Sequence, residues 1–89
     1  MSETPKELAS KLRAAKRGWS IAKTDVTEAQ LDVANADAAF AEHPSEAGES
    51  LCEKTAANLV GLKIKLIEAK LAFERAEIAF TDATDGWRK

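Results

Sequence analysis

The sequence predicts an all-α protein, an antiparallel two-helix coiled-coil hairpin whose helices meet along an alanine-rich seam. Three observations indicate this fold class. The 89 residues are 45% apolar and include only four glycines and two prolines, a composition that favours helix over sheet or disorder. Two long segments space their apolar residues alternately four and three apart. One short stretch rich in Pro, Ser and Gly separates them. We therefore expect one helical-hairpin domain spanning residues 1–89.

The first helix is expected over residues 5–42. Thr4 and Glu7 have the spacing of a capping box, in which the Thr4 hydroxyl accepts a hydrogen bond from the Glu7 N–H. Pro5 stands at the first helical position, where an N–H would have no partner within the helix. Pro44 disfavours helical geometry in the residue before it, so the helix should end near position 42.

The second helix is expected over residues 51–85, after a turn at residues 43–50. Ser50 and Glu53 have the spacing of a second capping box, although Ser45 offers an earlier start. An Asp-Gly pair near the end of the chain supplies a C-terminal stop. Because the turn is short, the two helices must run antiparallel.

Each expected helix carries an unbroken line of seam residues at spacings of four and three, the pattern of helices that pair as a coiled coil. In the first helix the seam consists of Leu8, Leu12, Ala15, Trp19, Ala22, Val26, Ala29, Val33, Ala36 and Phe40. In the second helix it consists of Thr55, Leu59, Leu62, Leu66, Ala69, Phe73, Ala76, Phe80, Ala83 and Trp87. Large and small residues alternate along much of both lines, so in nearly every layer a large side chain of one helix can face a small one of the other.

An internal similarity suggests how the two seams fit together. Residues 28–42 resemble residues 68–82, because both helices use the same alternation of large and small seam residues. In an antiparallel pair the numbers of contacting residues add to a constant. A constant of roughly 95 sets nearly every large residue against a small one, as dense packing requires. This register places Trp19 opposite Ala76 and centres the hairpin inside the expected turn.

The inventory of reactive side chains argues against catalysis. The chain has no tyrosine, one histidine and one cysteine. Cys52 lies one heptad before a seam leucine, so a packed thiol is a better interpretation than a nucleophile or a ligand. His43, Glu46, Glu49 and Cys52 could be grouped on paper as a metal site, but solvated turn acids are the simpler interpretation. We therefore expect no enzyme, no cofactor and no metal site.

The back of the second helix, on the side away from the seam, carries five large aliphatic residues. We call them the stripe: Val60, Ile64, Ile67, Leu71 and Ile78. The positions forty residues earlier in the first helix are mostly polar. An apolar stripe of this size is typical of an interaction site. It predicts a homodimer that forms a four-helix bundle, and a protein-interaction function as an adaptor, assembly factor or small inhibitor.

The net charge of −2 hides a division of charge along the chain. Residues 1–23 carry six basic and two acidic groups, whereas residues 24–49 carry seven acidic groups and no lysine or arginine. Three of the lysines flank the seam, where they can cover it and pair with acids such as Glu77. Arg13 and Arg17 are free on the outer surface. They define the alternative and less favoured function, a nucleic-acid-binding dimer that uses this basic half.

Neither a signal peptide nor an apolar run near the roughly 18 residues needed to cross a bilayer is found in the sequence. A single cysteine cannot form an internal disulfide. These features predict a cytoplasmic protein that does not associate with membranes.

Overall fold

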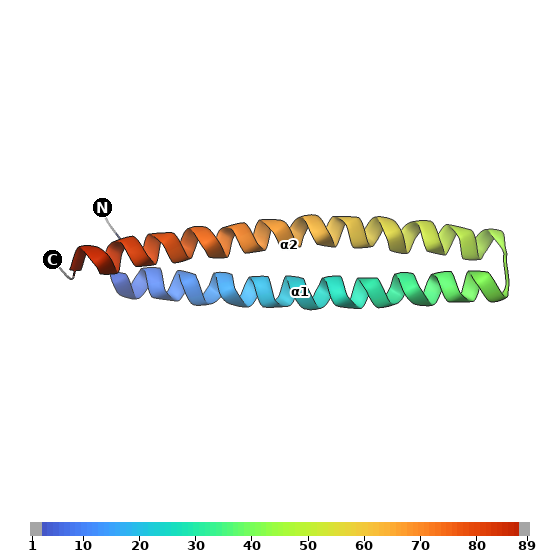
Figure 1. Ribbon diagram of the computed structural model, residues 1–89, viewed down its shortest axis with the longest axis horizontal. Helices are drawn as coiled ribbons and strands as arrows, with labels where there is room; N and C mark the ends of the chain where they lie inside the picture. The colour runs from blue at the N-terminus through green and yellow to red at the C-terminus, as the bar shows by residue number, and fades with distance from the viewer. Residues whose placement is uncertain (1–2, 88–89) are drawn as a thin grey trace.

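The computed structural model of the protein describes residues 3–87 and the side chains of residues 3–85. Two helices, α1 (Pro5–Glu42) and α2 (Glu46–Trp87), run antiparallel along their whole length (Figure 1). The molecule is a rod with extents of 66 × 17 × 15 Å. The expected all-α two-helix hairpin is therefore confirmed.

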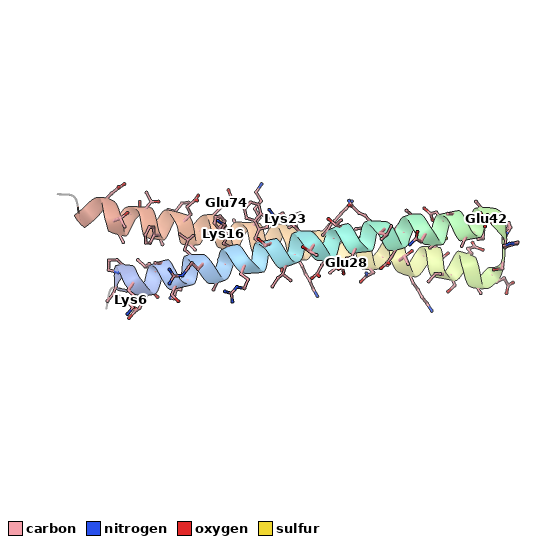
Figure 2. All side chains as sticks on the ribbon, turned by 90° about the horizontal axis from the view of Figure 1, so that it is seen from below. Lys6, Lys16, Lys23, Glu28, Glu42 and Glu74 are labelled. Carbon is pink, nitrogen blue, oxygen red and sulfur yellow. The ribbon has the colours of Figure 1, made fainter. Side chains whose placement is uncertain are left out.

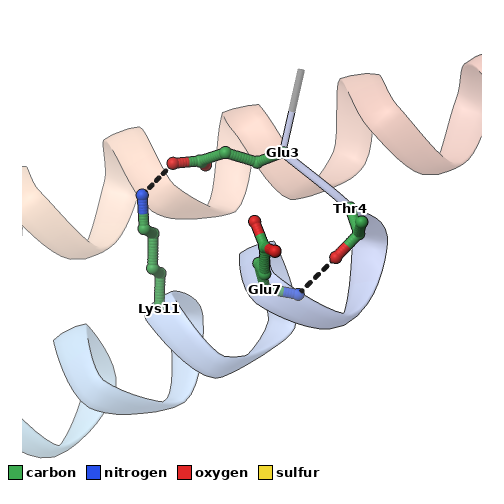
Figure 3. Close-up of polar contacts among 4 residues, drawn as sticks. All are labelled: Glu3, Thr4, Glu7 and Lys11. Carbon is green, nitrogen blue, oxygen red and sulfur yellow. Dashed lines mark hydrogen bonds and ion pairs between the residues drawn. The ribbon is translucent and has the colours of Figure 1, made fainter. Parts of the chain in front are cut away.

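α1 starts where the sequence predicts, and of the two hydrogen bonds of a capping box the described residues show one, from the Glu7 N–H to the Thr4 hydroxyl. Thr4 has extended backbone angles (φ −73°, ψ 154°), and its Oγ1 accepts a hydrogen bond from the Glu7 N–H at 3.2 Å (Figure 3). This bond satisfies one of the four N–H groups that a helix start leaves without a partner. At the other end the His43 N–H donates to the Ala39 carbonyl at 2.9 Å, and the helix ends at Glu42, two residues before Pro44.

The turn is shorter than expected, because α2 begins at Glu46 and not at residue 51. The Ser45 Oγ accepts a hydrogen bond from the Gly48 N–H at 3.0 Å, which makes Ser45 the N-cap of α2. The expected capping box at Ser50 is therefore wrong, and Ser50 lies inside the helix. Two acidic residues in the first turn of α2 favour the earlier start, since carboxylates stabilise the N-terminal end of the helix dipole.

The end of α2 also differs from the prediction. The helix continues through the Asp-Gly pair that was expected to stop it at residue 85 and ends at Trp87. A glycine inside a helix costs only about 1 kcal/mol relative to alanine, which is too little to end a helix by itself.

The seam is where the sequence places it. All seam positions from residue 8 to residue 83 are buried or half-buried. Among the described side chains only Val26, Ala29 and Ala36 are buried, and the other seam residues are half-buried, since each helix of a hairpin has a single neighbour to pack against. Trp87 belongs to the predicted seam, but its side chain lies outside the described side chains.

The register of the two helices differs from the prediction. Phe40, which the expected register sets opposite Thr55, lies beside Gly48, seven residues earlier. Its Cδ2 atom is 3.2 Å from the position that a Cβ on Gly48 would occupy, so the glycine permits this close approach. The Trp19 ring, expected opposite Ala76, stacks on the ring of Phe73 with 5.2 Å between centroids. The shorter turn moves the centre of the hairpin to residue 44 and shifts the pairing at the turn end by about one heptad.

Candidate interaction surface

The stripe is exposed along the back of α2. Val60, Ile64, Ile67, Leu71 and Ile78 are between 44% and 67% exposed. They lie between the seam positions of α2 in sequence, so their side chains point away from α1. Together they form an apolar surface that the hairpin itself does not cover.

The back of α1 is different in chemistry. Two threonines occupy positions forty residues before stripe residues. The Thr24 Oγ1 donates to the Ser20 carbonyl at 3.2 Å, and the Thr27 Oγ1 donates to the Lys23 carbonyl at 3.0 Å. These hydroxyls are satisfied within their own helix, so at these two positions α1 presents polar groups where α2 presents aliphatic side chains.

Three further aliphatic residues are exposed away from the stripe, and the sequence interpretation did not select them as a site: Ile21, Leu31 and Leu51. Leu51 borders a shallow groove of about 380 Å³ between the helices near the turn. The groove is lined by Asp32, Asn35, Ala36, Ala39, Leu51 and Thr55. Its position depends on the actual turn and register, so the expected helix start at residue 51 could not reveal it.

The basic half of α1 is partly engaged within the hairpin. Lys11 forms an ion pair with Glu3, which lies just before the helix (Figure 3). The Lys23 Nζ lies 4.2 Å from the centroid of the Trp19 ring, so this lysine covers the seam as expected. Across residues 3–85, however, no ion pair joins a lysine of α1 to Glu77, and the expected pairing across the seam is absent.

Charge is divided along the rod as the sequence indicates. Figure 2 shows Lys6, Lys16 and Lys23 toward the open end of the hairpin and Glu42 at the turn. Arg13 and Arg17 are both exposed. Neither forms an ion pair with the side chains of residues 3–85. The structure does not bring them together with the stripe, which lies on the other helix.

Cys52 is half-buried near the turn, one helical turn before Thr55, the first seam residue of α2. Partial burial raises the pKa of the Cys52 thiol above its ordinary value, and the nearby Asp37 carboxylate raises it further. Such a thiol is a poor nucleophile at neutral pH. In the described part of the chain, no group of three or more His, Cys, Asp or Glu side chains is arranged to hold a metal ion.

Within residues 3–87, neither helix contains a segment both long enough and apolar enough to cross a membrane. No known protein family, curated protein or solved structure matches the chain. The stripe is therefore the feature of the molecule that best supports a functional conclusion.

Proposed function

We propose that the protein is a non-enzymatic protein-interaction module that works as a self-associating helical hairpin. Its interface is the stripe, and its assembled form is a homodimer in a four-helix bundle with the two copies of α2 at the centre. The exposure of all five stripe residues is the observation that carries this proposal. Adaptor, assembly factor and small inhibitor are the roles that fit a chain offering only a binding surface.

The energetics support association. Burying a large aliphatic side chain contributes roughly 1.5–3 kcal/mol. Five such residues on each chain can offset the entropic cost of association. The hairpin also needs further burial, because a chain of 89 residues hides only about 60–65% of its unfolded surface.

The nucleic-acid alternative has less support. Lys11 and Lys23 are already engaged, with a carboxylate and an aromatic ring respectively. Four exposed basic residues of this half remain without an ion pair to a described side chain, namely Lys6, Arg13, Lys16 and Arg17. They form a small electrostatic footprint on a chain whose net charge is −2.

The proposal is tested by measuring the mass of the protein in solution with light scattering. The wild type should have twice the 9.6 kDa mass of one chain. Ile64→Glu combined with Ile67→Glu should give a helical monomer, because four carboxylates per dimer would otherwise be buried in the interface.

A matched control exists on α1. Thr24→Glu combined with Thr27→Glu places two carboxylates at the same spacing on the opposite helix, and this variant should remain dimeric. A folded wild type that is monomeric at high concentration would refute the proposal.

A further inference from the structure

We infer that the two copies pair antiparallel, with the two-fold axis beside Ala69. In this arrangement Val60 packs near the partner's Ile78, and Ile67 packs near the partner's Leu71. The inference rests on the proposed self-association and adds the partner's orientation and register.

The first step concerns the spacing of the stripe. Its five residues follow one another at intervals of four, three, four and seven. The long interval spans one position of the stripe line that is not aliphatic, where Glu74 stands. The stripe is thus a second heptad line on α2, and α2 has the pattern of a helix packed on two sides.

Antiparallel pairing of two such lines permits registers that differ by whole heptads. The register centred on residue 69 brings aliphatic against aliphatic at four of the five stripe positions, leaving Ile64 beside the partner's Glu74. A shift of one heptad toward the C-terminus would instead set Val60 and Ile64 against polar residues. That register buries less apolar surface and is disfavoured.

Charge disfavours a register shifted by one heptad toward the N-terminus. Such a shift would keep the aliphatic contacts but set Lys63 beside the partner's Lys70 and Lys54 beside the partner's Arg75. The register centred on residue 69 sets Lys63 beside the partner's Glu77, and a matching pair joins Lys54 to the partner's Asp82. Like charges facing each other across an interface oppose association, whereas opposite charges fix its register.

The four side chains of these opposite-charge pairs can contact a second chain. Lys54, Lys63, Glu77 and Asp82 are all exposed, and none forms an ion pair with any described side chain of its own chain. Two-fold symmetry makes each pair occur twice. At the axis the two copies of Lys70 approach on one side, and the two copies of Glu68 on the other. These two like-charge contacts reduce the gain from the four opposite-charge contacts without cancelling it.

A parallel dimer fails on two counts. It would place Glu74 against the same residue of the partner inside the interface between the two stripes, burying two like charges. It would also bring the two acidic segments 24–49, each with seven acidic groups and no lysine or arginine, to the same end of the assembly. The antiparallel arrangement instead puts each acidic turn end at the same end of the assembly as the partner's basic segment.

Disulfide trapping distinguishes the orientations. In a Cys52→Ser background, the double variant Val60→Cys with Ile78→Cys should form a covalent dimer on oxidation, because each cysteine faces its counterpart. Val60→Cys alone should not crosslink, because the two copies of residue 60 are about 27 Å apart along the antiparallel pair. Light scattering before oxidation verifies that each variant is still dimeric.

A charge exchange gives an independent test that leaves the stripe intact. Lys63→Glu should weaken dimerisation roughly two- to tenfold, and adding Glu77→Lys should restore it. The two positions are about 21 Å apart within one helix, so restoration requires a contact between chains. The weakening should shrink in high salt.

The outcomes separate the two proposals. A dimer in which Val60→Cys alone crosslinks, or in which Glu77→Lys fails to restore affinity, overturns the orientation and leaves self-association standing. A monomeric wild type overturns both.

Discussion

Ala29 shows how little space the seam leaves at the scale of a single residue. Its side chain is 2% exposed, the lowest value among the buried core residues. We predict that Ala29→Leu destabilises the protein by roughly 1–3 kcal/mol, because the added carbons force the helices apart. Urea unfolding measures the effect. Ala34→Leu, on the exposed side of α1, is the control and should change the free energy of unfolding by less than about 0.5 kcal/mol. Equal effects at both sites would mean that the seam is loosely packed.

Cys52 provides a second residue-scale prediction. Because partial burial and Asp37 raise the pKa of the thiol, its alkylation rate should reach half-maximum at a higher pH than in the urea-unfolded chain. The raised pKa also means that the folded state favours the protonated thiol. This contribution to the free energy of unfolding is fully present below the pKa of the unfolded thiol and is lost as the pH rises through the pKa of the folded one. Asp37→Asn should lower the midpoint toward, but not fully to, that of the unfolded chain. Identical midpoints in folded and unfolded protein would contradict this account.

At the scale of the helices, the cap of α2 can be tested directly. Ser45→Ala should destabilise the protein by about 1 kcal/mol, because the Gly48 N–H loses its acceptor. Ser50→Ala should be neutral or slightly stabilising, since residue 50 is inside the helix and alanine is the better helix former. Thermal unfolding of the two variants under the same conditions provides the measurement. A larger loss of stability for Ser50→Ala than for Ser45→Ala would support the longer turn predicted from the sequence.

The two helices also show which parts of the structure the sequence could predict. The α1 cap and the seam were predictable because each depends on residues three or four apart, which local geometry brings together. The start of α2 was ambiguous because Ser45 and Ser50 are both good caps, and only the hydrogen bond to Gly48 decides between them. The stripe was predictable as a set of residues, although Leu51 and its groove depended on the true turn.

The register was not predictable for a specific reason. Large and small seam residues alternate with a repeat of one heptad, so sliding one helix by seven residues leaves the pattern almost unchanged. Trp19, for example, faces Ala76 in the expected register and would face Ala69 after a shift of seven residues, and the Phe73 ring on which it stacks lies between these two alanines. Packing complementarity therefore narrows the choice to a few registers, and the length of the turn selects one of them.

At the scale of the whole molecule, the uneven charge provides a test of the alternative function. Arg13→Glu combined with Arg17→Glu should leave the helical content and the dimer mass unchanged, because both side chains are exposed and unpaired among the described residues. Neither the wild type nor the variant should be retained on immobilised RNA or DNA at low salt. Salt-dependent retention of the wild type that the variant loses would instead support nucleic-acid binding.

Both helices have their free ends, the start of α1 and the end of α2, at the same end of the 66 Å rod (Figure 1). Any polypeptide joined to either terminus would therefore be carried at one end, with the turn at the other. When two such rods stack antiparallel, the two pairs of free ends lie at opposite extremes of the assembly. The dimer would then hold two attached polypeptides apart by about the length of the rod. By the two-fold symmetry its two ends would be chemically identical, so the dimer would be a symmetric spacer.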